Sequence, residues 1–242
     1  MIYGGGPMYV EQLREAIRAF GPIFVQIFGQ GEAPMAITTL PRAEHVTGDD
    51  PVKLGRLASA GRECTGIRVR VVDDADADVP AGTMGEIVVR GDLVMKGYWN
   101  KPEATAETLR GGWLHTGDVG YLDAAGYLFI TDRKKDMIIS GGSNIYPREV
   151  EEVICQHPAV FEVSVIGVPD AKWGESVKAL VVARDGMKLT EPEIIEHCRR
   201  HLASYKKPQS VDFLPSLPKN AYGKILKREL REQYWSGRIR QV

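Results

Sequence analysis

The chain has 242 residues, of which 43% are hydrophobic and 26% are charged, and its formal net charge at pH 7 is -1. This composition is ordinary for a globular protein with one large domain or two smaller ones, and the near-zero charge gives no electrostatic reason to expect binding to nucleic acid. No apolar run approaches the roughly 20 residues that a transmembrane segment needs, and the N-terminus lacks the basic and apolar segments of a signal peptide.

The cysteines indicate a compartment. Cys64, Cys155 and Cys198 lie far apart and show no CxxC spacing. An odd number of scattered cysteines argues against a disulfide framework, so we expect a cytoplasmic protein in a reducing environment.

Residues 1–60 predict the tail of an α/β layer. The chain opens like the end of a buried strand that runs into a glycine-rich turn, as if it began within a domain. Residues 8–20 carry apolar side chains at the spacing of an amphipathic helix, namely Val10, Leu13, Ile17 and Phe20. Residues 23–30, IFVQIFGQ, then predict a buried strand that ends in a glycine-containing turn.

Residues 61–132 predict a different, β-rich subdomain. Its short apolar runs are separated by Gly, Asp and Pro turns: TGIRVRVVD, GEIVVRG, GWLHTGDVGYLD and GYLFITDR. Regular short strands of this kind indicate a small antiparallel sheet or a β-barrel-like subdomain. Between them, KPEATAETL predicts a short helix with Pro102 near its start.

Residues 133–242 predict a compact α+β domain. Strands are expected at 137–142, 160–170, 175–184 and 211–218, and helices at 146–157, 190–202 and 224–235. Thr190 and Glu193 have the spacing of a capping box at the start of the second helix. We expect the boundary near residues 132–135, which makes the whole chain an α+β, multi-domain protein.

Four polar clusters interrupt this scaffold, and each has an ordinary structural explanation as well as a chemical one. In FGQGEAP, Gly29 and Gly31 allow close approach of a ligand and Glu32 can bind a hard cation such as Mg²⁺, but a surface turn would look the same. In HTGDVGYLD, the Asp118 carboxylate can accept two hydrogen bonds from a vicinal diol such as ribose, but an Asx turn between strands would also place it there.

The other two clusters are basic. Arg133 can bind ribose or phosphate oxygens, and Gly141 and Gly142 form a surface free of side chains; a hairpin turn with solvated lysines is the alternative. Lys224 follows Gly223 in a loop before a basic helix, where it can reach a distant site as a point charge or simply be solvated.

Taken together, the motifs resemble the adenylate-forming superfamily, and in particular its acyl-CoA synthetases and fatty-acid–CoA ligases. The resemblance covers nearly the whole chain and is carried by GGGPM, FGQGE, GEIVVRGDLVMKGYWN, GWLHTGDVGYLDAAGYLFITDRKKDMIISGGSNIYPREVE and PKNAYGKILKREL. It implies a domain order: the end of the large N-terminal domain (1–60), its β-rich subdomain (61–132) and a mobile C-terminal domain (133–242).

The resemblance assigns an adenine-binding segment. Gly5, Gly6 and Pro7 match the residues that line the adenine pocket. Phe28 matches an aromatic residue that stacks near adenine, and Gly29 belongs to the same cofactor-binding segment.

It also implies roles for charged residues. Glu32 matches the acid associated with Mg²⁺ and with catalysis, Asp118 the acid that binds both ribose hydroxyls, and Arg133 an arginine on the ribose side. Lys224 matches the catalytic lysine required for adenylate formation.

A joint and a thiol channel complete the implied site. Lys135 occupies the hinge position, and Gly141 and Gly142 match the loop that borders the pantetheine channel. The implied reaction joins a carboxylate to AMP with release of pyrophosphate, and the C-terminal domain then rotates so that CoA forms a thioester. ATP, Mg²⁺ and CoA are therefore the expected cofactors, with a carboxylic acid, fatty or aromatic, as the substrate.

Two departures from the family pattern qualify this expectation. Gly31 stands where the family has a Thr whose hydroxyl binds a phosphate. Glycine cannot make this hydrogen bond, and a hydrogen bond to a charged group contributes about 1.5–3 kcal/mol. Family members are also about twice as long, and no phosphate loop is recognisable in this sequence. Three hypotheses follow: the C-terminal part of a ligase that is inactive alone, half of a split ligase that needs a partner chain, and a non-catalytic nucleotide- or CoA-binding module. The partners expected for the chain are an N-terminal half or a second copy in a homo-oligomer.

Overall fold

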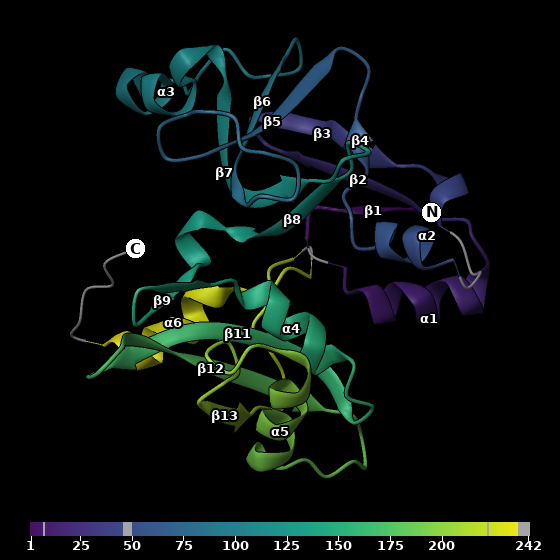
Figure 1. Cartoon of the computed structure of the whole chain (residues 1–242), viewed down its shortest axis with the longest axis vertical. Helices are drawn as coiled ribbons and strands as arrows, with labels where there is room; N and C mark the ends of the chain where they lie inside the picture. The colour runs from purple at the N-terminus through teal and green to yellow at the C-terminus, as the bar shows by residue number, and fades with distance from the viewer. Residues whose placement is uncertain (7, 46–49, 222, 237–242) are drawn as a thin grey trace. The chain divides into compact units, whose positions relative to one another are not determined.

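In a computed structural model of the chain, the structure describes residues 1–6, 8–45, 50–221 and 223–236. Its contacts divide the chain into two compact units, Met1–Lys134 and Lys135–Val242. Figure 1 shows the elements of each unit.

The first unit begins with the expected strand, helix and strand. Strand β1 (Ile2–Gly4) pairs in parallel with β2 (Val25–Gln30), and α1 (Val10–Phe20) connects them. The sheet has the order β1-β2-β3-β4, in which β3 (Ala33–Leu40) pairs antiparallel with β2, and β4 (Arg62–Glu63) pairs antiparallel with β3. Helix α1 buries Leu13 and Ile17 against Leu57, which directly follows the short helix α2 (Pro51–Arg56).

The second sheet of this unit is an antiparallel meander. Its order is β5-β6-β7-β8, with β5 (Ile67–Val72), β6 (Gly85–Gly91), β7 (Leu114–Leu122) and β8 (Leu128–Arg133). Over the described residues the sheet is open, so the chain adopts the antiparallel sheet rather than a closed barrel. Helix α3 (Pro102–Thr108) lies between β6 and β7 in the chain. One hydrophobic core joins Ile37 of the first sheet to Ile87 and Leu128 of the second.

The second unit is a sheet covered on both faces. Its strands are β9 (Ile138–Ser140), β10 (Ser143–Ile145), β11 (Val160–Asp170), β12 (Gly174–Ala183) and β13 (Ser210–Phe213). Its helices are α4 (Pro147–Cys155), α5 (Glu191–His201) and α6 (Lys227–Trp235).

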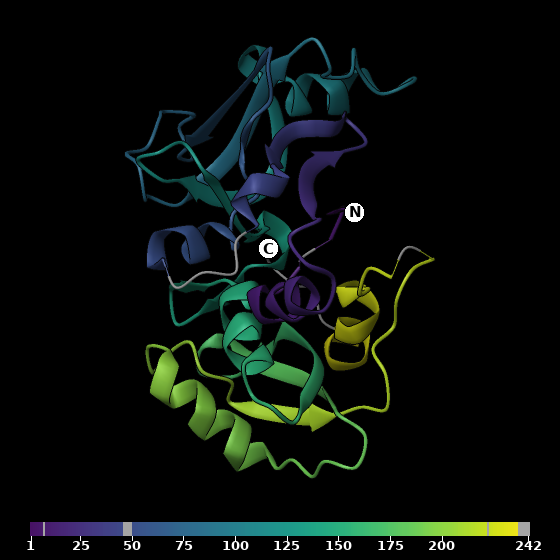
Figure 2. The same cartoon turned by 90° about the vertical axis from the view of Figure 1, so that its right-hand side faces the viewer.

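The alternation of side chains along β12 explains the two layers. Val177, Ala179 and Val181 face a core formed with α4 and α5, whereas Leu180 and Val182 face a second core that includes Leu230 of α6. Because successive strand residues point to opposite faces, a nearly continuous apolar strand requires helices on both sides, as Figure 2 shows.

Local signals agree with these elements. Pro147 occupies the first turn of α4, where a missing N–H costs nothing. The capping box at α5 is formed: the Glu193 carboxylate accepts hydrogen bonds from the Thr190 amide and hydroxyl, each at 2.8 Å.

Candidate nucleotide-binding site

Asp118 and Arg133 meet directly across two strands of the first unit. They are register partners of β7 and β8, and Arg133 Nε lies 3.2 Å from Asp118 Oδ1. The Asp118 side chain is 8% exposed, whereas the Arg133 side chain is 40% exposed. The alternative explanation, an Asx turn between strands, does not hold, because Asp118 lies inside β7 and its carboxylate pairs with a cation from the neighbouring strand.

The backbone around Asp118 is shaped by its neighbours. Gly117 has a φ of +69°, a left-handed conformation that favours glycine, and the Asp118 amide donates to Thr116 Oγ1 at 3.1 Å. Thr116 in turn donates to the Ile87 carbonyl of β6 at 2.7 Å. The strand is therefore bent locally and fixed to its neighbour at the position of the predicted ribose ligand.

Glu32 lies in the two-residue turn that joins β2 to β3. The Tyr98 hydroxyl donates to Glu32 Oε1 at 2.7 Å, and the Met95 amide donates to the Glu32 carbonyl at 2.7 Å. The hydrogen bond to Glu32 raises the pKa of Tyr98, because the carboxylate stabilises the protonated phenol. One carboxylate oxygen is thus engaged by the chain, and the Glu32 side chain has a fixed partner 66 positions away.

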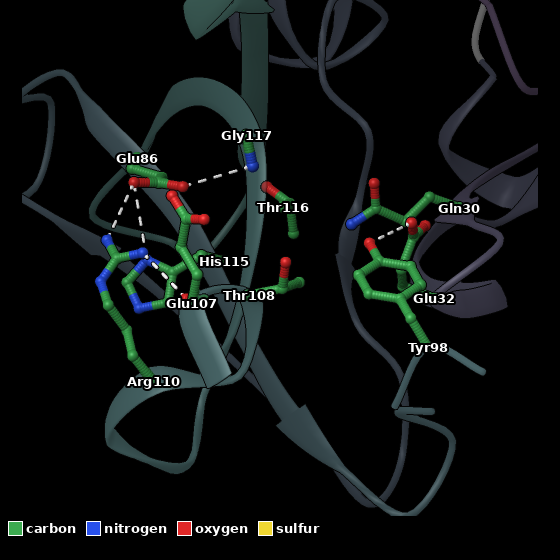
Figure 3. Close-up of a pocket in the computed structure, with 10 residues that line it drawn as sticks. All are labelled: Gln30, Glu32, Glu86, Tyr98, Glu107, Thr108, Arg110, His115, Thr116 and Gly117. Carbon is green, nitrogen blue, oxygen red and sulfur yellow. Dashed lines mark hydrogen bonds and ion pairs between the residues drawn. The ribbon is translucent and has the colours of Figure 1, made fainter. Parts of the chain in front are cut away.

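A cavity of about 310 Å³ brings these segments together. Figure 3 shows Glu32 and Tyr98 on one side and Glu86, Arg110 and His115 on the other. Its full lining is Gln30, Glu32, Glu86, Tyr98, Glu107, Thr108, Arg110, His115, Thr116 and Gly117. The cavity therefore connects the turn of Glu32 with the residue next to Asp118.

The adenine-side candidates have mixed environments. Gly5 and Gly6 are exposed just after β1, with a φ of +77° at Gly5, whereas Phe28 is half-buried and packs against the core of the first unit. Position 29 requires glycine for packing, because a Cβ there would approach the Met35 amide nitrogen to 2.3 Å. Pro7 lies outside the described residues.

In the second unit, Gly141 and Gly142 form the two-residue turn between β9 and β10. Their φ values are +57° and +80°, as such a hairpin turn requires. The Gly141 amide donates to the Trp173 carbonyl at 2.9 Å, and the Lys172 ammonium lies 4.6 Å from the centroid of the Trp173 ring. The glycine turn therefore has an exposed aromatic residue beside it, with a cation on its ring.

Lys224 lies in an exposed loop before α6. The Asn220 side chain accepts from the Lys224 amide at 2.9 Å, and the Asn220 amide donates to the Lys224 carbonyl at 2.9 Å. These bonds fix the backbone of the loop. Lys135 lies in a 3₁₀ turn, Lys134–Asp136, and is exposed at the start of the second unit.

Sequence reasoning missed two residues of this site. Tyr98 contacts Glu32, and Glu86 contacts the Gly117 amide at 3.3 Å. Both occur in segments that carried the family resemblance, GEIVVRG and GYWN, but their partners are distant in the chain, so no local spacing indicated a role. Over the described residues, no group of three or more His, Cys, Asp or Glu side chains is arranged to hold a metal.

The comparisons with known proteins identify the class of protein to which this fold belongs. The AMP-binding enzyme family matches residues 1–99, and the AMP-binding enzyme C-terminal domain matches residues 149–224. The chain belongs to the AMP-binding enzyme family, whose members include the adenylate-forming acyl-CoA ligases.

Individual relatives agree with this assignment. The medium/long-chain-fatty-acid–CoA ligase FadD8 of Mycobacterium tuberculosis is 44% identical over 99% of this chain and 42% of its own length. The amide bond synthetase McbA of Marinactinospora thermotolerans superposes with a TM-score of 0.89 at 37% identity, covering 96% of this chain and 46% of that one. The o-succinylbenzoate CoA synthetase of Bacillus subtilis, solved with its acyl-adenylate intermediate, superposes with a TM-score of 0.82 at 38% identity. The match covers 95% of this chain and 45% of that one.

The chain thus spans somewhat under half the length of the relatives that it matches. Ligases of this family use ATP and CoA and act on carboxylic acids. No helix in the described parts of the chain is long and apolar enough to cross a membrane.

Proposed function

We propose that the chain supplies the nucleotide-binding β-subdomain and the mobile C-terminal domain of an ATP-dependent acyl-CoA ligase. The observation that carries the proposal is the buried Asp118 carboxylate paired with Arg133, beside a cavity that Glu32 also lines. A buried acid with an oxygen directed toward a vicinal diol is the usual way in which proteins bind ribose.

In the proposed reaction, a substrate carboxylate oxygen attacks the α-phosphorus of ATP. The bond between the α-phosphorus and the bridging oxygen breaks, and pyrophosphate leaves with the electron pair. The thiolate of CoA then attacks the acyl carbonyl, and AMP leaves. Lys224 stabilises the negative charge that develops in the first step, an electrostatic role that typically contributes a few kcal/mol.

Rotation about Lys135 is part of this proposal. Lys224 and the Gly141–Gly142 turn both belong to the second unit, so one rigid body can present them to the adenylate in turn. Lys134 and Lys135 are exposed, and Lys134 pairs with the exposed Asp74 at 2.9 Å, so solvent can reach both residues at the proposed pivot. A Lys135→Pro change would fix this backbone and is expected to spare adenylation while blocking thioester formation.

The residues present can supply one carboxylate ligand to Mg²⁺, that of Glu32. Protein sites for Mg²⁺ on nucleotides need only one or two carboxylates, because the phosphates and water supply the other ligands. Glu32 provides one carboxylate, and its second oxygen is not the acceptor of the Tyr98 hydrogen bond. The bound ion would neutralise phosphate charge.

The acid is proposed to be a fatty or an aromatic carboxylic acid. Relatives include fatty-acid–CoA ligases, 2-succinylbenzoate–CoA ligases and feruloyl-CoA synthases, all matched at 44–45% identity. The three cysteines are free, which supports a reducing, cytoplasmic location. Two alternatives remain candidates: half of a split ligase and a nucleotide- or CoA-binding module without catalysis.

ATP–pyrophosphate exchange tests these proposals. We expect the 242-residue chain to bind AMP but to give no exchange with a panel of fatty and aromatic acids. Robust exchange by the chain alone would overturn both the inactive-part proposal and the non-catalytic module. Tight nucleotide binding without exchange, both by the chain alone and by the FadD8 chimera described next, would favour the non-catalytic binding module.

A chimera provides the complementary test. Replacing the matching portion of FadD8 by this chain should give exchange with fatty acids, and Lys224→Ala should abolish exchange yet spare thioester formation from supplied acyl-adenylate. Lys219→Ala is the control, because Lys219 lies in the same loop but pairs with Glu162. An active Lys224→Ala chimera would contradict the proposed role of Lys224.

A further inference from the structure

The Glu86 side chain contacts both flanks of the Asp118–Arg133 pair. It projects from β6, its side chain is only 11% exposed, and its Oε1 accepts a hydrogen bond from the Gly117 amide at 3.3 Å. Its Oε2 lies 3.9 Å from the Lys134 ammonium. Gly117 precedes Asp118 and Lys134 follows Arg133, so one carboxylate touches the neighbour of each member of the pair.

The surrounding charges make this carboxylate the centre of a network. Arg110 Nη2 and His115 Nδ1 each lie 3.5 Å from Glu86 Oε2. Arg110 also binds Asp76 at 3.1 and 3.2 Å, and Lys134 binds Asp74 at 2.9 Å. Asp74 is nearly fully exposed, so its pair with Lys134 is screened by solvent, whereas Glu86 keeps its charge largely out of water.

We propose that Glu86 is a positioning residue that couples nucleotide binding at Asp118 to the hinge segment at Lys134 and Lys135. This inference rests on the proposed function, because it takes Asp118 and Arg133 as the ribose site and the Lys134–Lys135 peptide bond as the start of the hinge. One Glu86 oxygen holds the Gly117 backbone and thereby orients the Asp118 carboxylate. The other oxygen restrains Lys134, the last residue of the first unit.

This role differs from that of an ordinary stabilising network. Ordinary stabilisation predicts that loss of Glu86 lowers the midpoint of unfolding and nothing else. Coupling predicts that occupancy of the nucleotide site changes the accessibility of the backbone at Lys134, and that Glu86 transmits part of that change.

Limited trypsin digestion of the 242-residue chain, together with AMP binding, measures the accessibility of Lys134 and the occupancy of the nucleotide site. Trypsin cuts after Lys and Arg, and mass spectrometry separates cleavage after Lys134 from cleavage after Arg133 or Lys135. The initial rate is recorded with and without saturating AMP, and the dissociation constant of AMP is measured by calorimetry. In the wild-type chain we expect AMP to slow cleavage after Lys134.

Two variants separate the two oxygens. Glu86→Gln keeps an oxygen for the Gly117 amide but loses the charge, so cleavage after Lys134 without AMP should rise about two- to fivefold, the range of a partly exposed ion pair. AMP should protect this variant less than the wild type. Glu86→Ala loses both contacts and should also weaken AMP binding by up to about tenfold.

Glu63→Gln is the matched control. It makes the same change of charge in the first unit but outside the lining of the cavity, and Glu63 also accepts a backbone hydrogen bond, from the Val69 amide at 3.0 Å, and lies 3.5 Å from a cation, Arg68 Nη1. Its cleavage rate after Lys134 and its AMP affinity should equal those of the wild type. The proposal is overturned if Glu86→Gln and Glu63→Gln are indistinguishable in cleavage and protection, even when Glu86→Gln is less stable.

Failure of the proposed function gives a different result. If the wild-type chain binds no AMP, the ribose site itself is refuted and the coupling with it. The cleavage ratio between Glu86→Gln and Glu63→Gln without nucleotide would then still decide whether Glu86 holds Lys134.

Discussion

At the scale of single residues, Asp118 allows ribose recognition to be tested without catalytic turnover. Asp118→Asn should weaken AMP binding about 10- to 100-fold, because a hydrogen bond to a charged group contributes about 1.5–3 kcal/mol. Calorimetry with AMP and with 2′,3′-dideoxy-AMP provides the control. The wild type should prefer AMP strongly and the variant should not, whereas an equal preference in both proteins would exclude ribose as the partner of Asp118.

Tyr98 offers a second test, of stability and its dependence on pH. Tyr98→Phe removes the hydrogen bond to Glu32 and should lower the free energy of unfolding by about 1 kcal/mol near neutral pH. The pKa of Tyr98 is raised above its ordinary 10.0 in the folded chain. Its contribution is therefore fully present below pH 10 and is lost as the pH rises further, so the difference between the two proteins should shrink there.

Urea unfolding at neutral pH and above pH 10 measures this difference. Tyr121→Phe is the control, since the Tyr121 hydroxyl has no hydrogen-bond partner among the residues that the structure describes. Equal losses in the two variants at neutral pH would show that the Glu32 contact contributes nothing.

At the scale of elements, the glycine turn of the second unit separates backbone strain from packing. Gly141 and Gly142 both have positive φ, so alanine at either position should cost about 1–2 kcal/mol. A Cβ on Gly141 would also lie 2.6 Å from Trp173 Cε3, whereas one on Gly142 would meet open space. Gly141→Ala should therefore destabilise the second unit more than Gly142→Ala.

The measurement is urea unfolding followed by tryptophan fluorescence. In the FadD8 chimera, Gly141→Ala should also slow thioester formation more than adenylation. Gly186→Ala, at another exposed turn with a φ of +75°, controls for strain alone. If Gly141→Ala matched Gly142→Ala in stability, the contact with Trp173 would have no energetic weight.

The elements themselves were largely predictable because their signals are local. Helical spacing in residues 8–20 gave α1, and the apolar runs gave β11 and β12. The apolar residues 33–40, APMAITTL, fit a contact with the acyl group as well as a buried strand, and the structure has β3 there. Glu86 and Tyr98 were missed because their partners are distant in the chain: Glu86 contacts Gly117 of β7, and Tyr98 contacts Glu32 in the turn between β2 and β3.

At the scale of the whole molecule, each unit has its own hydrophobic core. Ile87 is fully buried in the first unit, and Ile154 is fully buried in the second. Because each core lies within one unit, we expect two calorimetric transitions rather than one.

Core substitutions assign these transitions. Ile87→Ala and Ile154→Ala should each cost about 2–5 kcal/mol, and each should lower only the transition of its own unit. Val52→Ala, at an exposed position, is the control and should move neither transition. A single transition shifted equally by both core variants would mean that the two units unfold as one.

The pairing of Asp118 with Arg133 also limits how this protein can vary. Side chains alternate along a strand, so one residue inserted or deleted between Leu128 and Arg133 would turn the guanidinium to the opposite surface of the sheet. The exposed residues 124–126 of the preceding turn lie outside that constraint, and the turn can lengthen there without disturbing the pair. Homologous sequences should therefore tolerate gaps in that turn while keeping the spacing of β8 constant.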